Sequence, residues 1–289
     1  MREFIISTES NADLPENFIT DHHICVIPHY YSIDDKVYGE EEEVSIETFY
    51  NAMRSKKKVA TMASNPAVIK ERFAVHAEAG KDILHISFSS ELSAGYSNIV
   101  MMATEIMEEY PECTIKVVDT KSASAGEMMM IIKALECLGD GKSLAETAAV
   151  VEALVPHLCL QFVVDDLDYL YRGGRLSKTS AILGSIVAVK PILYVDEKGK
   201  LAALDKVRGR KKSIAALADN MEKRLGTFRD KQITVGIIHG DCEADALYLK
   251  EIIHSRFGYD DFIIRPIGPS IGAHSGPGAL GITYLGEYR

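Results

Sequence analysis

The residues that decide the fold class are 82–96, Asp82-Ile83-Leu84-His85-Ile86-Ser87-Phe88-Ser89-Ser90-Glu91-Leu92-Ser93-Ala94-Gly95-Tyr96. The first seven form a short apolar run of the kind that makes a buried strand. Residues 96–109 follow with apolar side chains at helical spacing. A polar loop between a buried strand and an amphipathic helix is typical of an α/β fold with parallel strands.

The same alternation of strands and helices extends to both sides of this segment. Asn65-Pro66 predicts the start of a helix, because asparagine caps well and proline fits the first helical turn. Ser143 and Glu146 have the spacing of a capping box. We also expect strands at 4–7, 24–33 and 114–118, and helices at 45–53, 125–138 and 143–154.

Pro156 interrupts this alternation, so we place a domain boundary beside it. Beyond it, the turn-rich segment 196–200 predicts a hairpin between residues 187–195 and 201–207. Further strands are expected at 158–164, 233–239 and 262–266, and further helices at 167–171, 213–225 and 244–257. The sequence therefore predicts two α/β domains with mostly parallel sheets, residues 1–157 and 158–289.

Composition excludes several functional classes. The 289 residues are 47% hydrophobic and 26% charged, which is ordinary globular composition. The net charge of −10 argues against binding to nucleic acid or to an anionic membrane surface. The five cysteines have no close pair, which argues against a disulfide framework or a zinc site. No apolar run approaches a membrane span or a signal-peptide core, so we expect a cytoplasmic protein.

Four clusters of small polar residues and glycines are the main candidates for a binding site. They are Thr61–Pro66, Phe88–Tyr96, Tyr171–Lys178 and Ile267–Gly278. Ser93 precedes a predicted helix, whose free N–H groups attract anions, although most serine caps serve only their own helix. Arg172 and Arg175 offer guanidinium groups that suit a carboxylate or phosphate, or alternatively hold the turn between helices.

A group of histidines and a group of aspartates are better explained by a structural role than by metal binding or catalysis. His22, His23 and His29 are expected on the surface, because no carboxylate or thiol at metal-ligand spacing joins them. The acidic group Asp165, Asp166 and Asp168 is expected to complement a helix dipole rather than bind a cation. No metal site and no catalytic residue is predicted.

Taken together, the clusters resemble the DegV family of bacterial fatty-acid-binding proteins, also called FakB. The resemblance covers nearly the whole chain, and the order and spacing of the segments make it specific. The segments that carry it are Thr8–Pro15, Thr61–Pro66, Ser89–Tyr96, Val118–Ser122, Tyr171–Ser177, Lys190–Leu193, Lys206–Lys212 and Ile267–Gly278.

The resemblance implies a ligand tunnel between two α/β domains that holds a long-chain fatty acid. It implies that Thr61 and Ser93 bind the carboxylate, helped by the backbone amides of Ala94 and Gly95, with His274 nearby. It also implies a carrier without a cofactor, which presents the bound lipid to a separate fatty acid kinase for acyl-phosphate formation and so supports phospholipid synthesis. Three departures from the family pattern are Glu9 for a common aspartate, Met62-Ala63 for more polar residues, and Ala94-Gly95 for the commoner Gly-Thr.

The role of the arginines and of the tunnel walls stays open at this stage. Arg172, Arg175 and Arg208 are candidates for kinase docking or for the vicinity of the head group, and Arg208 belongs to a basic cluster that also fits an ordinary solvated helix start. The candidate tunnel residues, for each of which core packing is the simpler explanation, are Ile27, Phe162, Ile192 and Ile264. The alternatives to a carrier are a phosphotransferase or hydrolase that uses His274 or His239, and a regulatory sensor of a bound acyl chain.

Overall fold

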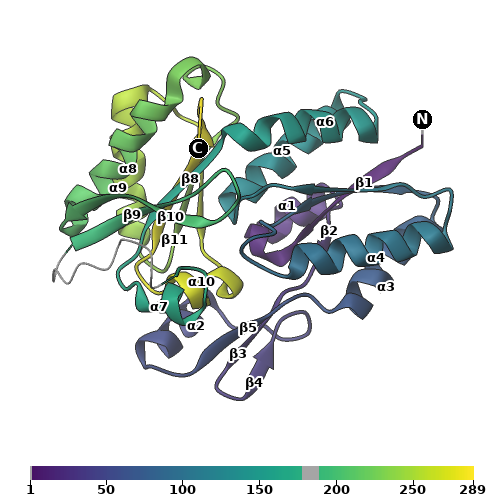
Figure 1. Ribbon diagram of the computed structural model, residues 1–289, viewed down its shortest axis with the longest axis horizontal. Helices are drawn as coiled ribbons and strands as arrows, with labels where there is room; N and C mark the ends of the chain where they lie inside the picture. The colour runs from purple at the N-terminus through teal and green to yellow at the C-terminus, as the bar shows by residue number, and fades with distance from the viewer. Residues whose placement is uncertain (1, 178–188) are drawn as a thin grey trace.

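The computed structural model describes residues 2–177 and 189–289. Its first sheet is parallel, with the strand order β2-β1-β6-β7. Figure 1 shows it on the side of the molecule that carries the N-terminus. The bounds of its strands are β1 Phe4–Glu9, β2 Cys25–Ile27, β6 Asp82–Ser87 and β7 Ile115–Asp119. The parallel α/β arrangement predicted from residues 82–96 is therefore confirmed for this sheet.

Helices cover both faces of the first sheet. On one face, Phe73 of α3 and Ile99 of α4 pack against Ile83 of the central strand β6. On the other face, Met129 of α5 and Val151 of α6 pack against hydrophobic residues of strands β1 and β6. The bounds are α1 Glu16–Asp21, α3 Pro66–Glu78, α4 Gly95–Glu109, α5 Ala125–Gly139 and α6 Leu144–Leu154.

The second sheet is mixed, and the prediction of mostly parallel strands is wrong for it. Its order is β10-β9-β8-β13-β11-β12, and in the described residues only β11 and β12 pair in parallel. The reason is that the last strand inserts between β8 and β11 and runs opposite to both. The bounds are β8 Leu158–Val163, β9 Val189–Val195, β10 Leu201–Arg208, β11 Val235–His239, β12 Phe262–Pro266 and β13 Leu280–Leu285.

The predicted hairpin is confirmed as the antiparallel pair β9–β10, while residues 187 and 188 of the prediction lie outside the described residues. Two long helices, α8 (Arg210–Leu225) and α9 (Glu243–Phe257), pack against this sheet through Leu217, Met221 and Leu249. Short helices complete the lobe: η2 Val155–His157, α7 Asp168–Arg172, η3 Gly226–Phe228 and α10 Pro269–Ser275.

A small antiparallel sheet, β4-β3-β5, lies beside the first and was not expected. Residues 24–33, predicted as one extended segment, divide into β2 and β3 at Pro28-His29, and proline cannot donate to a strand ladder. The helix α2 (Ile46–Arg54) packs against this sheet, which comprises β3 Tyr30–Ile33, β4 Lys36–Tyr38 and β5 Val59–Met62.

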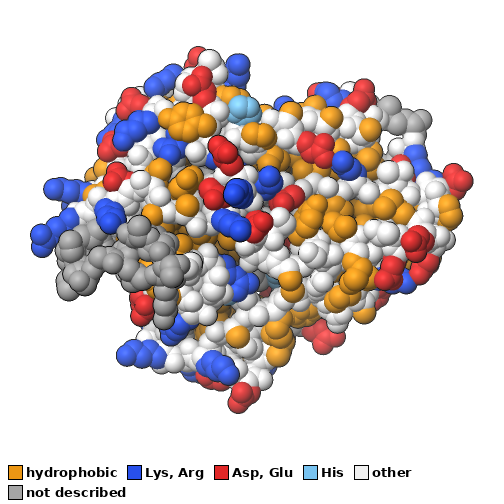
Figure 2. Space-filling model, in the orientation of Figure 1, with side chains coloured by type: hydrophobic (Ala, Val, Ile, Leu, Met, Phe, Trp, Pro, Cys, Tyr) orange, Lys and Arg blue, Asp and Glu red, His pale blue; other side chains and the backbone are white. Residues whose placement is uncertain are grey.

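Local signals behave as the sequence predicts. The Asn65 side chain accepts a hydrogen bond from the Ala67 amide, and Ser143 and Glu146 form the capping box. All five cysteines are free thiols, and four of them are buried. Within residues 2–177 and 189–289, no helix has the length and hydrophobicity needed to cross a membrane. Figure 2 shows acidic and basic side chains interspersed over one face of the molecule.

The two lobes share hydrophobic core. Leu158 and Leu285, from the second sheet, belong to the same buried cluster as Phe4 and Leu84 of the first sheet. This continuity holds the lobes against each other and fixes the space between them. A division at residue 157 remains a prediction.

Candidate ligand-binding site

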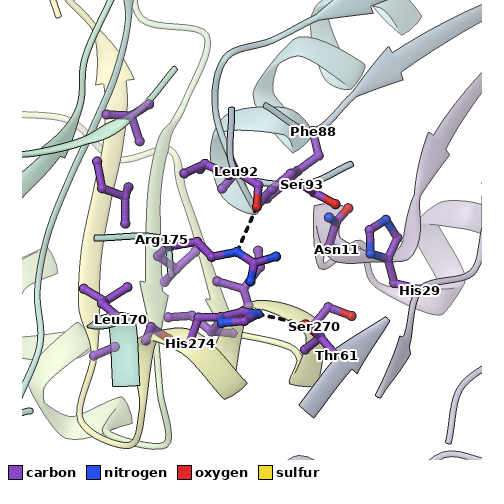
Figure 3. Close-up of a pocket in the computed structure, with 18 of the residues that line it drawn as sticks. Asn11, His29, Thr61, Phe88, Leu92, Ser93, Leu170, Arg175, Ser270 and His274 are labelled. Atoms are coloured by element: carbon purple, nitrogen blue, oxygen red, sulfur yellow. Dashed lines mark hydrogen bonds between the residues drawn. The ribbon is translucent and has the colours of Figure 1, made fainter. Parts of the chain in front are cut away.

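A cavity of about 180 Å³ lies between the first and second sheets. Its apolar wall is formed largely by strands of the second sheet, and its polar residues come from β5, from α10 and from loops. Figure 3 shows Asn11, His29, Ser93 and Thr61 on the side of the cavity that lies away from Leu170. The lining includes Asn11, His29, Thr61, Phe88, Leu92, Ser93, Ala94, Leu160, Phe162, Arg175, Val195, Ile238, Ser270, His274 and Ser275.

Thr61, at the end of β5, meets His274 of α10 inside this cavity. Thr61 Oγ1 lies 2.8 Å from His274 Nε2. Burial, reinforced by the nearby Arg175, lowers the pKa of His274 to about 4, so the imidazole is neutral at neutral pH. A neutral ring that donates from Nε2 leaves the Thr61 hydroxyl hydrogen available to a ligand.

Ser93 reaches the cavity from the loop between β6 and α4. Its Oγ accepts a hydrogen bond of 3.0 Å from the Gly95 amide, so its own hydroxyl hydrogen can point to a ligand. The helix begins at Gly95, one position earlier than predicted, and the residue that caps it is Ala94 and not Ser93. Ala94 also lines the cavity, whereas Gly95 lies behind Ser93.

Arg175 brings a positive charge to the same cavity. Its Nε donates to the Leu92 carbonyl at 3.0 Å and its Nη1 to the Gly173 carbonyl at 2.6 Å. No carboxylate in the described part of the chain forms an ion pair with it. Desolvation lowers the pKa of Arg175, but a guanidinium remains charged at neutral pH. Within residues 2–177 and 189–289, the charge therefore has no counter-ion.

The structure separates the other predicted arginines from this cavity. Arg172 is exposed and lines a neighbouring groove, whereas the exposed Arg208 at the end of β10 lines neither. His239 is buried, contacts the Cys242 amide, and does not line the cavity. Of the four candidate wall residues, Phe162 lines it, while Ile27, Ile192 and Ile264 belong to other hydrophobic clusters.

Two buried polar residues that line the cavity, His29 and Asn11, were not predicted as site residues. His29, expected on the surface, is only 7% exposed, and Asn11 is 3% exposed. Within the described residues, neither Asn11 Oδ1 nor His29 Nε2 has a hydrogen-bond partner. His29 follows Pro28 at the break between β2 and β3, and that position next to a strand end was the available signal.

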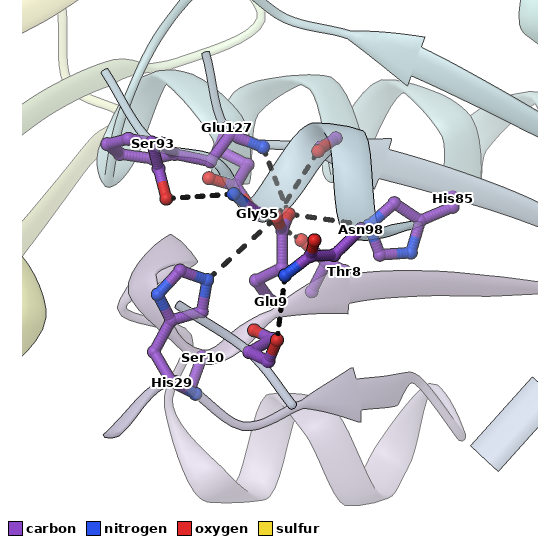
Figure 4. Close-up of polar contacts among 12 residues, drawn as sticks. Thr8, Glu9, Ser10, His29, His85, Ser93, Gly95, Asn98 and Glu127 are labelled. Carbon is purple, nitrogen blue, oxygen red and sulfur yellow. Dashed lines mark hydrogen bonds and ion pairs between the residues drawn. The ribbon is translucent and has the colours of Figure 1, made fainter. Parts of the chain in front are cut away.

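A buried polar network lies directly behind His29 (Figure 4). Glu9 accepts hydrogen bonds from the Phe88 amide at 3.0 Å and from Ser87 Oγ at 3.2 Å, and it lies 3.3 Å from His85 Nε2. Burial alone would raise the pKa of Glu9, but its contacts with His29 and His85 hold the pKa well below the ordinary value. Glu9 therefore carries a negative charge inside the protein.

The described residues contain no group of three or more histidine, cysteine, aspartate or glutamate side chains that could hold a metal ion. The acidic residues of the loop before α7 instead serve local structure. Asp166 accepts a hydrogen bond from the Asp168 amide, and Asp165 pairs with Lys190.

Comparison with known families agrees with this architecture. The model of the family described as "Uncharacterised protein, DegV family" matches residues 3–287. The chain belongs to the DegV family. Among its relatives, a DegV domain-containing protein of Clostridium perfringens is 37% identical, over 100% of this chain and 99% of that protein.

Solved DegV structures have the same fold. A DegV family protein from Thermus thermophilus, described as binding fatty acid, has a TM-score of 0.88 at 25% identity and covers 99% of this chain. A fatty acid binding DegV family protein from Streptococcus agalactiae has a TM-score of 0.87 at 26% identity over the same share. In both cases 100% of the solved chain is covered.

Proposed function

We propose that this DegV protein is a carrier that binds a long-chain fatty acid in the cavity between its sheets. The carboxylate is bound by Thr61 and Ser93, near Arg175 and His274, and the alkyl chain lies against the apolar wall. The proposal is supported by the description of two DegV relatives as fatty-acid-binding proteins. It includes a cytoplasmic location, in keeping with the free thiols, and no cofactor.

The observation that carries the proposal is that Arg175 has no carboxylate partner among the described residues. Hydrogen bonds to two backbone carbonyls offset part of the cost of desolvating this guanidinium, and an opposite charge stabilises it further. A fatty acid carboxylate supplies the missing counter-ion and accepts hydrogen bonds from the Thr61 and Ser93 hydroxyls. Charge-assisted hydrogen bonds contribute about 1.5–3 kcal/mol each, enough to offset the desolvation of the carboxylate.

The apolar wall supplies the affinity for the chain. A C16 to C18 acid has about 15 methylenes, and burying them yields roughly 12 kcal/mol before the cost of association. The cavity of about 180 Å³ is smaller than the roughly 300–1,000 Å³ of pockets for drug-sized ligands. We therefore expect side chains such as Leu92 and Phe162 to move apart around the longer chains.

We also propose that the protein presents the bound carboxylate to a fatty acid kinase for acyl-phosphate formation. Thr61, Arg175 and His274 line a second, open groove as well as the cavity, so the groove leads from the surface to the head group. Its other charged side chains are all basic among the described residues: Lys56, Lys57, Lys58 and Arg172. Such a groove attracts the negatively charged phosphates that a kinase brings to the carboxylate.

The enzyme alternative receives less support. It requires His274 or His239 to act with a nucleophile or base, yet His239 does not line the cavity. His274 lies in the cavity and is held by Thr61, an arrangement that orients a hydroxyl toward a ligand.

Organic extraction of the purified protein, followed by mass spectrometry, tests the carrier. We expect a C14 to C18 fatty acid at close to one molecule per chain. The matched sample is a Thr61→Val/Ser93→Ala variant purified in parallel, which we expect to carry much less. A protein that yields no lipid and does not bind added hexadecanoic acid would refute the proposal.

A further inference from the structure

His29 and Ser93 border the same small space. Gly95, the first residue of α4, has no side chain, and a β-carbon placed there would lie 3.3 Å from Ser93 Oγ. The same point would lie 3.5 Å from His29 Nε2 and 3.5 Å from Glu9 Oε1. His29 and Ser93 also both line the cavity, so the buried imidazole faces the region in which the proposed carboxylate contacts Ser93.

His29 lies beside a fixed negative charge. Its Nε2 lies 3.9 Å from Glu9 Oε1, within reach of an ion pair but too far for a hydrogen bond. His85, on the other side of Glu9, lies within hydrogen-bond distance of Ser7 Oγ as well. Its two ring nitrogens are thus engaged within the network, whereas His29 Nε2 has no hydrogen-bond partner in the described residues.

The negative charge of the network belongs to Glu9 and not to its neighbour Glu127. Thr8 Oγ1 lies 2.9 Å from the Ile86 carbonyl and 2.6 Å from Glu127 Oε1, and its one hydrogen can serve only one of them. Burial, reinforced by the charge of Glu9, raises the pKa of Glu127 well above the ordinary value. The uncharged form of Glu127 is therefore favoured, whereas Glu9 holds the negative charge.

The other charged groups around His29 are mostly carboxylates. The groove on the far side of His29 is lined by one arginine, Arg265, against several acidic residues. Inside the cavity, the charged group is Arg175 and the titratable neighbour is His274. The acidic residues that share the groove with His29 and Glu9 are Asp13, Glu16, Glu40, Glu41 and Glu43.

We infer that His29 is a head-group-binding residue that takes up a proton when a fatty acid carboxylate binds, and so stands as an imidazolium beside both that carboxylate and Glu9. Two carboxylates facing one space repel each other strongly in a buried site, whereas a cation beside them attracts both. This inference rests on the proposed function. It predicts that the protein distinguishes a carboxylate from a neutral head group on an identical chain.

The test uses hexadecanoic acid and hexadecan-1-ol, which differ only in the head group. Calorimetric titration at about pH 7, in phosphate and in Tris, measures the protons exchanged, because the two buffers differ in ionisation enthalpy. For the unmodified protein we expect net proton uptake with the acid and none with the alcohol. For His29→Gln we expect the acid to bind at least tenfold more weakly without uptake, and the alcohol within twofold of the unmodified protein.

His22→Gln is the matched control, because His22 is exposed and directly follows α1. This variant should behave as the unmodified protein does.

Should His29→Gln fail to fold, nitrogen-15 NMR of the histidines in the unmodified protein replaces the calorimetry of that variant. The expected result is that the acid, but not the alcohol, raises the pKa of His29. Proton uptake that persists in His29→Gln, or no uptake in the unmodified protein, would overturn the inference while leaving fatty acid binding intact. If neither ligand binds, the proposed function itself fails.

Discussion

Thr61 Oγ1 and His274 Nε2 lie 2.8 Å apart although 213 positions separate the two residues in the chain. One comes from the small sheet beside the first lobe and the other from the helix that precedes the last strand. Their contact therefore joins the two sides of the cavity at its polar end. It also makes the orientation of the Thr61 hydroxyl depend on a neutral histidine.

Replacing the two hydroxyls should weaken fatty acid binding without unfolding the protein. We expect Thr61→Val and Ser93→Ala each to raise the dissociation constant for hexadecanoic acid at least tenfold, because each removes a donor to a buried anion. Displacement of a fluorescent fatty acid measures this. Thr104→Val, on the exposed side of α4, is the control and should bind as the unmodified protein does. Unchanged affinity in both site variants would exclude these hydroxyls from head-group binding.

Gly173 provides the space in which His274 packs. A β-carbon at Gly173 would overlap His274 Nδ1, so Gly173→Ala should displace the imidazole and disturb its contact with Thr61. We expect weaker fatty acid binding with little change in the free energy of unfolding, since the ring can move. Gly139→Ala is the control, because nothing lies within 4 Å of that position. Equal affinities for the two variants would show that the placement of His274 is immaterial.

The stability of the protein should depend on pH through Asp13. This buried carboxyl accepts hydrogen bonds from Ser124 Oγ and from the Gly268 amide, and so connects the two lobes. Burial raises the pKa of Asp13 to about 7, above the ordinary value of 3.8. The stabilisation of the folded protein by protonated Asp13 is fully present below about pH 4. It is lost as the pH rises through 7, because the folded state binds the proton more tightly than the unfolded state in that range.

Asp13→Asn mimics the protonated side chain and removes this dependence. As the pH falls from about 7 to about 4, the free energy of unfolding of the unmodified protein should rise relative to that of the variant. The rise should be at most about 1.4 kcal/mol per pH unit. Urea unfolding at several pH values measures the difference. A difference that does not change with pH would contradict the assignment.

Arg172 and Arg208 lie on different basic surfaces, and their substitution should affect the kinase reaction to different extents. Arg172 lines the groove that leads to the head group, whereas Arg208 lines neither that groove nor the cavity. Arg172→Glu should therefore lower the rate of acyl-phosphate formation by a fatty acid kinase at least tenfold, with unchanged fatty acid affinity. Arg208→Glu should have a smaller effect. The reverse order would place the kinase on the surface near α8 instead.

Local sequence signals predicted the parts of the site that lie at strand and helix ends. The loop Ser89–Tyr96 follows a buried strand and precedes a helix, so its polar residues had to lie at an edge of a sheet. Thr61 and the glycine-rich segment around His274 were found in the same way, together with the resemblance of their order to one family. The joining of these segments at one cavity is a finding of the structure.

The features that were missed depend on contacts distant in sequence. Nothing beside His29 in the sequence indicates that Glu9 lies next to it or that His85 lies beyond Glu9, since these residues come from strands β1 and β6. The mixed second sheet is likewise decided by where the last strand inserts, which its own residues do not specify. The small sheet was indicated by the sequence, because Asp34 and Asp35 separate two short segments of strand-forming residues. Asp34 has a positive φ of 54°, as in a tight turn.

The position of a bound carboxylate is the most direct test of the account. A crystal structure of the protein with hexadecanoic acid should show the carboxylate within hydrogen-bond distance of Thr61 Oγ1 and Ser93 Oγ, with the chain between the two sheets. A carboxylate bound elsewhere, or a chain that lies outside the cavity lined by Phe162, would contradict it.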